Sequence, residues 1–225
     1  MSGPAVHRGA RGRVQAVGTA RGAATRRATT FAAAIAIATA TAPRARADEA
    51  ARIEALVQGQ CAICHGTDGE NATPAFPRLA AQNADYVARQ LAAFRSGARR
   101  NATMQGVVAQ LEPKDFAAIG AWYASRPAQA HPSGDPGLAF AGKALWNGGN
   151  LPAGVPACAT CHGADGHGGP LVPRLAGQHP EYVVRQLKTF GTRAKTHDNA
   201  SMHLIAQRLT DAEMRAVAAW VAGLR

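Results

Sequence analysis

The sequence Cys61-Ala62-Ile63-Cys64-His65 returns in altered form as Cys158-Ala159-Thr160-Cys161-His162. Each copy follows the pattern C-x-x-C-H, in which two thiols stand three positions apart and a histidine follows directly. The two copies contain all four cysteines of the 225-residue chain. No cysteine is therefore left for a separate structural disulfide.

The C-x-x-C-H pattern is typical of covalent attachment of a c-type haem. Thiols at this spacing can form thioethers with the two vinyl groups on one edge of the haem, and the adjacent imidazole can bind the iron. We therefore expect two covalently bound haem c groups. The residues expected to hold them are Cys61, Cys64 and His65 in the first copy and Cys158, Cys161 and His162 in the second.

Two other kinds of site use paired cysteines: a zinc site built from two C-x-x-C knuckles and a redox-active dithiol. Four cysteines would satisfy zinc and leave His65 and His162 unexplained. Histidine makes up 8 of the 225 residues, so a chance histidine after both motifs is expected in about one sequence in 800. Haem attachment explains both histidines.

The chain around the motifs is an internal repeat. Pro77-Arg78-Leu79-Ala80 returns 96 positions later as Pro173-Arg174-Leu175-Ala176. Two homologous domains are therefore predicted. Residues 126–137 are rich in proline and glycine, which is typical of a linker. We place the domains at 48–132, with the linker from 126, and at 133–225.

Both halves have the pattern of an all-α fold, with no alternating strand pattern. Apolar residues at helical spacing predict a first helix over 48–60. Asn83 can cap a following helix, and Thr210 with Glu213 forms a capping box before the last helix.

A low-spin haem needs a sixth ligand, usually methionine or histidine. Met104 lies 39 residues after His65 and Met202 lies 40 residues after His162, each after an Asn-Ala-(Thr/Ser) tripeptide in what we expect to be a polar loop. We therefore expect both to bind iron, and Met214 to be a core residue. A packing role alone remains an alternative for Met104 and Met202. His203 is a competing ligand, which we expect to be exposed.

The basic charge of the chain belongs to its N-terminus. Residues 1–47 hold eight of the 25 basic residues and no acid, which leaves 17 basic against 14 acidic residues, about +3 of the formal +11. We therefore expect no nucleic-acid partner.

Residues 1–47 have the pattern of a signal peptide cleaved after Ala47, which predicts the periplasm. An uncleaved anchor, a disordered basic tail and twin-arginine export remain alternatives.

With these residues in view, the chain resembles the cytochrome c4 family, periplasmic di-haem cytochromes made of two class I cytochrome c domains. The shared features are the duplicated Cys-His-Gly, the Pro-Arg-Leu-Ala stretch, the Tyr-Val-x-Arg-Gln-Leu helix and the late methionine. The resemblance implies that the carbonyls of Pro77 and Pro173 accept the axial imidazole N–H, and that Arg89 and Arg185 pair with haem propionates. It also implies that Trp122 and Trp220 pack the last helix of each domain against its first helix.

The resemblance implies an electron carrier and not an enzyme. Its partners would be a quinol-oxidising complex and a terminal oxidase or reductase, and it leaves open whether the carrier rests on the membrane surface. One alternative is a cytochrome subunit of a periplasmic dehydrogenase such as flavocytochrome sulfide dehydrogenase. Another is a peroxidase or a thiosulfate-oxidising di-haem enzyme, which needs a haem whose sixth site is vacant or otherwise ligated. The second half departs from the first in a Gly/Pro-rich loop at 147–156, which we expect to shape a docking surface.

Overall fold

The computed structural model describes the backbone of residues 30–192 and 200–225, and the side chains of 45–192 and 200–225. Most of the expected signal peptide lies outside the described residues. The chain divides into two units, Met1–Arg46 and Ala47–Arg225, and the second unit contains both C-x-x-C-H motifs.

Helix α1 is Thr30–Gln60, so the predicted helix start at residue 48 is wrong. The alanine-rich sequence before Asp48 has a high intrinsic helix propensity, which apolar periodicity does not reveal.

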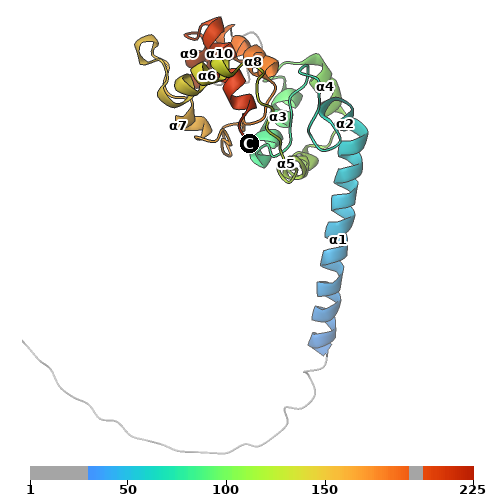
Figure 1. Ribbon diagram of the computed structural model, residues 1–225. Coiled ribbons are helices and arrows are strands. Elements are labelled where there is room, and N and C mark those ends of the chain that lie inside the picture. The colour runs from blue at the N-terminus through green and yellow to red at the C-terminus, as the bar shows by residue number, and fades with distance from the viewer. Residues whose placement is uncertain (1–29, 193–199) are drawn as a thin grey trace, which may run out of the picture. The chain divides into compact units, whose positions relative to one another are not determined.

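The unit Ala47–Arg225 is built from helices (Figure 1). After α1, the first half contains α2 Ala62–His65, α3 Ala84–Ser96, α4 Ala102–Ala109, the 3₁₀ helix η1 Pro113–Asp115 and α5 Phe116–Ala124. The second half contains α6 Pro136–Gly148, η2 Leu151–Ala153, α7 Ala159–His162, α8 Pro180–Thr192, α9 Ala200–Ala206 and α10 Asp211–Ala222. The described residues contain two isolated β-bridges and no strand. The predicted all-α fold is confirmed.

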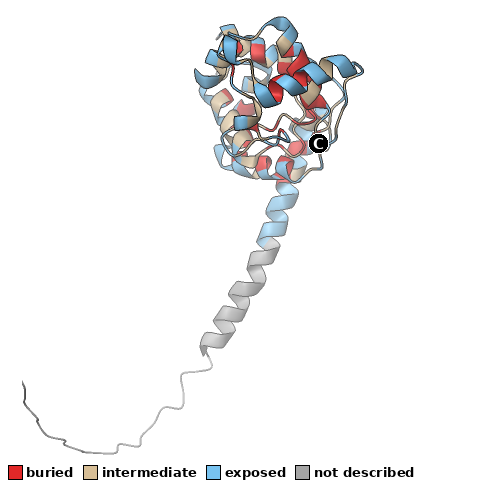
Figure 2. Cartoon of the chain, turned by 60° about the vertical axis from the view of Figure 1, so that its left-hand side comes forward, coloured by how far each residue is buried: buried red, intermediate tan, exposed pale blue. Residues whose placement is uncertain are grey.

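Each half buries a hydrophobic core of its own, and in Figure 2 buried residues alternate with exposed ones along the helices. The largest fully buried side chains are Tyr123 and Ile119 in the first half and Trp146 in the second. Residues 125–135, between α5 and α6, contain no helix. The domain limits 48–132 and 133–225 stay a prediction.

One of the two predicted helix caps is confirmed and the other is wrong. At α10, Thr210 accepts from the backbone N–H of Glu213 at 3.2 Å, and Glu213 accepts from the backbone N–H of Thr210 at 2.8 Å. Asn83 occupies the N-cap position of α3, but its side chain makes no capping bond. Its amide donates instead to the carbonyls of His167 and Val172 in the second half, at 3.0 and 3.2 Å. A contact between the halves therefore replaces the local cap.

The segments that carry Met104 and Met202 are helical, so the expectation of polar loops is wrong. Met104 lies in α4 and Met202 in α9. At α4, the side chain of Asn101 accepts from the backbone N–H of Met104 at 2.9 Å. Asparagine is a favoured N-cap because its oxygen satisfies a free N–H of the first turn. The tripeptide that resembled a loop in fact begins a helix.

The last helix of each half packs against the first. Trp122 of α5 donates its indole N–H to Glu54 of α1, and Lys143 of α6 lies 5.5 Å from the ring centroid of Trp220 of α10. Helices α6 and α10 approach so closely that a Cβ atom on Gly142 would lie 1.9 Å from the carbonyl oxygen of Ala216. Glycine at 142 therefore permits this helix crossing.

Substitution of Gly142 tests that crossing. Gly142→Ala is expected to lower the free energy of unfolding by about 1–3 kcal/mol, because the methyl group forces α6 and α10 apart. The measurement is denaturant unfolding of the haem-loaded protein. Gly148→Ala is the matched control in the same helix, since a Cβ there has no described atom within 4 Å. Equal stability of Gly142→Ala and the parent protein would contradict the close packing of the two helices.

Candidate haem sites

The two motif histidines are buried and oriented in the same way. His65 ends α2 and His162 ends α7, and each is 7% exposed. Nδ1 of His65 lies 2.9 Å from the carbonyl oxygen of Pro77, and Nδ1 of His162 lies 3.2 Å from that of Pro173. Because a carbonyl only accepts, Nδ1 carries the proton in each ring. These are the hydrogen bonds that the family resemblance implied for the two prolines.

The other ring nitrogen, Nε2, is left with a free lone pair. Among residues 45–192 and 200–225, the structure gives Nε2 of His65 and His162 no hydrogen-bond partner. Burial lowers the pKa of both histidines, which favours the neutral imidazole that a metal requires. The two rings therefore fit an axial role toward haem iron.

The cysteines also fit haem better than the rival sites. All four are free thiols in the structure. Burial raises the pKa of the Cys61 thiol and raises that of Cys158 to about 11, whereas a reactive dithiol needs a lowered pKa. The described residues contain no group of three or more His, Cys, Asp or Glu side chains placed to hold a metal ion. The zinc-knuckle alternative therefore lacks a ligand cluster in the described part of the chain.

The candidate sixth ligands share a core with the cysteine of their own half. Met104 is half-buried and packs against the first core together with Cys61. Met202 is half-buried and packs against the second core together with Cys158. Met214 is only 5% exposed within that second core, so its predicted core role is confirmed. Ligation by Met104 and Met202 stays a prediction.

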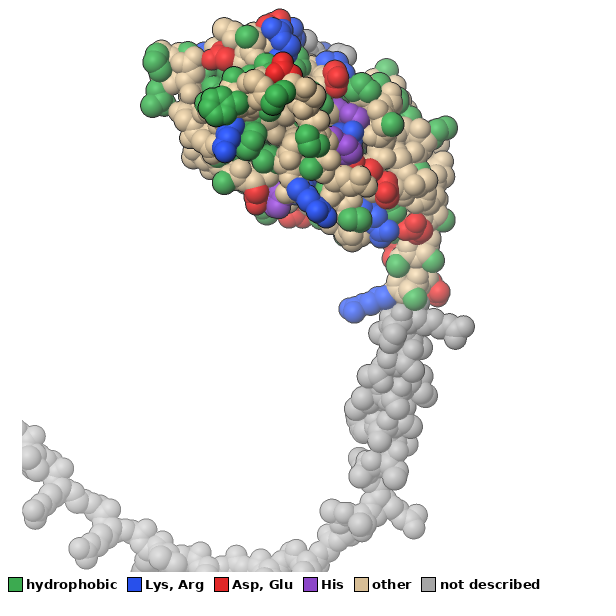
Figure 3. Space-filling view, viewed as in Figure 1, with side chains coloured by type: hydrophobic (Ala, Val, Ile, Leu, Met, Phe, Trp, Pro, Cys, Tyr) green, Lys and Arg blue, Asp and Glu red, His purple; other side chains and the backbone are tan. Residues whose placement is uncertain are grey.

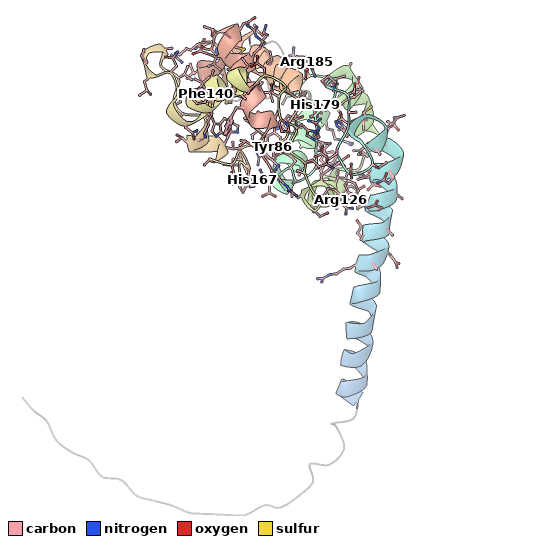
Figure 4. All side chains as sticks on the ribbon, in the orientation of Figure 1. Tyr86, Arg126, Phe140, His167, His179 and Arg185 are labelled. Atoms are coloured by element: carbon pink, nitrogen blue, oxygen red, sulfur yellow. The ribbon has the colours of Figure 1, made fainter. Side chains whose placement is uncertain are left out.

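His203 is not exposed as expected. It is half-buried, and its Nδ1 lies 2.8 Å from the carbonyl oxygen of Phe190, because α9 packs against α8 at this point. His179 is buried, with Nε2 3.0 Å from the side-chain oxygen of Asn71 in the first half. His167 is exposed and reaches the carbonyl of Arg225. Figure 4 labels His167 and His179.

Arg89 and Arg185 make contacts that the sequence did not predict. The guanidinium of Arg89 donates to the carbonyl of Pro170, and that of Arg185, which Figure 4 labels, donates to the carbonyls of Pro74 and Ala75. Each arginine thus reaches backbone of the opposite half. Their pairing with propionates stays a prediction, and the structure provides better placed cations.

Those cations are Arg78 and Arg174, the arginines of the repeated Pro-Arg-Leu-Ala stretch. Arg174 is 8% exposed, and its Nε is buried with no hydrogen-bond partner among the described residues. Arg78 donates to the carbonyl of Gly177 at 2.8 Å and has Nε 3.2 Å from Glu70, without hydrogen-bond geometry. Arg174 makes no ion pair with a carboxylate of the described residues, and a buried cation without a paired anion is costly. A haem propionate would supply that anion, so this orphaned nitrogen also fits a haem. The repetition of the arginine in both Pro-Arg-Leu-Ala stretches was the sequence signal that could have indicated this role.

Two buried glutamines, also missed from the sequence, join the halves. Gln82 accepts from the backbone N–H of Arg174 at 2.7 Å and donates to the Arg174 carbonyl at 2.9 Å. Gln178 makes the same pair of bonds with Arg78, at 2.9 and 2.9 Å. Each glutamine is 5% exposed. The two contacts are reciprocal, as expected when two copies of one repeat meet.

The Gly/Pro loop at 147–156 is hydrogen-bonded to α10 at one residue and exposes an apolar side chain at the next. Asn150 donates to Glu213 at 2.7 Å, while Leu151 is 73% exposed. Phe140 of α6 and Leu171 in the same half are also exposed. Figure 3 shows hydrophobic side chains on the part of the surface where Figure 1 labels α6. The proposed docking role of the loop stays a prediction. No helix in the described residues is long and apolar enough to cross a membrane.

Family models match both halves of the chain. One described as "Cytochrome C oxidase, cbb3-type, subunit III" matches residues 48–122. One described as "Cytochrome c" matches residues 140–225.

Whole-chain relatives cover most of the sequence. Cytochrome c4 of Pseudomonas aeruginosa is 37% identical over 168 residues, which is 73% of this chain and 83% of that protein. A "Thiosulfate dehydrogenase electron acceptor" of Thiomonas intermedia is 37% identical over 171 residues, 72% of this chain and 77% of that protein. The crystal structure of reduced cytochrome c4 from Pseudomonas stutzeri aligns with a TM-score of 0.73 at 32% identity, covering 78% of this chain and 98% of that one.

Removal of Arg174 tests whether an anion meets its guanidinium in the loaded protein. If a propionate pairs with it, Arg174→Met is expected to lower the free energy of unfolding by about 3–5 kcal/mol. Denaturant unfolding of the haem-loaded protein measures this change. Arg208→Met, at an exposed arginine that donates to the backbone carbonyl of Leu204, is the control and should cost about 0.5–1.5 kcal/mol. A gain in stability in Arg174→Met would show an unpaired buried charge and contradict the assignment.

Proposed function

The chain belongs to the cytochrome c4 family, and we propose that it carries electrons in the periplasm from a quinol-oxidising complex to a terminal oxidase or reductase. As a member of that family it is a di-haem electron carrier, with two covalently bound haem c groups, and not an enzyme. The observation that carries the proposal is the pair of buried histidines, each held by Nδ1 on a proline carbonyl with Nε2 free.

The proposed ligand sets are His65 with Met104 and His162 with Met202. Haem c would supply an iron that gains and loses one electron, and a methionine ligand beside the histidine ligand would raise its reduction potential. Support comes from the similar spacing of the methionines, 39 and 40 residues after the motif histidines, and from their packing on the same cores as Cys61 and Cys158. Two protein ligands on each iron leave no site for a substrate, which suits a carrier.

The chain's own residues have three tasks in this proposal. Pro77 and Pro173 orient the imidazoles through their carbonyls, which hydrogen-bond to Nδ1. Arg174 would supply buried positive charge for a propionate, and half-buried Arg78, which already pairs with Glu70, would add a second cation. Arg89 and Arg185 would share this role only after leaving their present carbonyl partners. The two hydrophobic cores keep water from the ligands.

The periplasmic location is supported by the sequence pattern of the N-terminus. Residues 1–47 combine an arginine-rich start, a short apolar stretch and Ala45-Arg46-Ala47. Such a leader directs export, and it is removed from the mature protein. We therefore propose cleavage after Ala47, which leaves Asp48 as the first residue of the carrier.

A second candidate is the acceptor of electrons from a thiosulfate dehydrogenase. The Thiomonas intermedia relative bears that description and matches over 77% of its own length. In this alternative the donor is an enzyme that oxidises thiosulfate, and the carrier itself performs no substrate chemistry. Neither this relative nor the one from Pseudomonas aeruginosa is named for flavocytochrome sulfide dehydrogenase, so neither favours the subunit alternative.

Rapid-mixing kinetics separate the two donors. The oxidised, mature, haem-loaded protein is mixed either with native membranes and quinol or with purified thiosulfate dehydrogenase and thiosulfate. The respiratory proposal predicts fast haem reduction by the membranes, abolished when quinol is omitted, and reoxidation by the same membranes when oxygen or another terminal acceptor is added. Fast reduction by the dehydrogenase alone would favour the second candidate. Slow reduction by both would contradict both.

A further inference from the structure

A single peptide group connects each motif histidine to the opposite half of the molecule. The carbonyl of Pro77, which lies 2.9 Å from Nδ1 of His65, shares its peptide group with the N–H of Arg78. That N–H donates to Oε1 of Gln178 at 2.9 Å. Two hydrogen bonds therefore connect the imidazole of His65, through the Pro77–Arg78 peptide group, to Gln178 of the second half.

The second half repeats the same chain of bonds in the opposite direction. Nδ1 of His162 lies 3.2 Å from the carbonyl oxygen of Pro173. The peptide group of that carbonyl continues into the N–H of Arg174, which donates to Oε1 of Gln82 at 2.7 Å. Each histidine is thus connected to a glutamine of the other half.

The side-chain amide of each glutamine is fixed in one orientation by further hydrogen bonds. Both are 5% exposed. Each Oε1 also accepts the backbone N–H of the next residue, Asn83 or His179, at 3.1 and 3.0 Å. Each Nε2 donates to the arginine carbonyl across the interface. These additional bonds hold the side-chain amide, so Oε1 stays directed at the arginine N–H.

Hydrogen bonds on the two sides of one peptide group strengthen each other. When the N–H donates, electron density moves to the carbonyl oxygen, which then accepts more strongly. A stronger acceptor draws the Nδ1 proton and makes the imidazole a more electron-rich ligand. Such a ligand stabilises oxidised iron, and therefore lowers the reduction potential.

We propose that Gln82 and Gln178 are positioning residues through which each half tunes the haem of the other: Gln178 lowers the potential of the haem on His65, and Gln82 that of the haem on His162. The inference rests on the proposed ligation by these histidines. Contact between the halves then does more than hold them together, because it sets the electron affinity of both irons.

The test replaces each glutamine by methionine, which has a similar length but no acceptor oxygen of comparable strength. Gln178→Met is expected to raise the potential of the haem on His65 and leave the other unchanged, and Gln82→Met to do the reverse. The potentials are measured by redox titration of the holoprotein followed by NMR, which assigns each step to a haem. In the reduced protein, the Nδ1–H signal of the affected histidine should move upfield as its hydrogen bond weakens.

Two further variants separate this role from a merely structural one. Asn83→Ala also removes side-chain bonds between the halves, to the carbonyls of His167 and Val172, but neither bond touches the peptide group beside a motif histidine. It should leave both potentials unchanged. Gln178→Glu keeps an acceptor oxygen and should not raise the potential of the haem on His65.

The proposal is overturned if each methionine variant shifts the haem of its own half, if neither potential moves, or if Asn83→Ala has as large an effect. Should Gln178→Met fail to fold, Gln178→Glu decides alone, since a raised potential there contradicts the proposal. Failure of the proposed ligation has a different signature: the parent protein would then lack two histidine Nδ1–H signals shifted by a haem ring current.

Discussion

The hydrogen bond between a motif histidine and a proline carbonyl is the interaction on which both haem sites depend. It places the proton on Nδ1 and leaves Nε2 free in two buried rings, at 2.9 Å in the first half and 3.2 Å in the second. Burial of each ring removes competing water and favours the neutral form. The proposed iron ligation by both histidines, and with it the electron-carrying function, requires this orientation.

Duplication makes the same bond part of the contact between the halves. The peptide groups that bind His65 and His162 are also the ones that Gln178 and Gln82 reach across the interface. Around them, Asn83, Arg89 and Arg185 bind backbone carbonyls of the opposite half. Two similar surfaces that meet must satisfy each other's polar groups, and repeated sequence supplies matching donors and acceptors. The interface therefore lies beside both haem sites.

The parts that could be predicted from sequence are those set by local chemistry or by the repeat. The C-x-x-C-H motifs predicted two covalently bound haem c groups, periodicity predicted the all-α class, and Thr210 with Glu213 formed the expected capping box. Contacts between distant segments could not be predicted: Asn83 bonds across the interface instead of capping, and His203 is half-buried against α8. The sequence shows that Arg174 repeats Arg78 in the Pro-Arg-Leu-Ala stretch. Only the folded structure shows that Arg174 is buried and that its Nε lacks a partner among the described residues.

A spectroelectrochemical redox titration of the mature, exported protein tests the central claim most directly. With histidine and methionine on both irons, we predict two one-electron steps at clearly positive potentials, and low-spin spectra throughout. A haem that titrates at a far lower potential, or stays high-spin, would contradict this claim, because Met104 or Met202 would then not bind iron. A vacant or differently ligated haem would turn attention from electron transfer to chemistry at the iron.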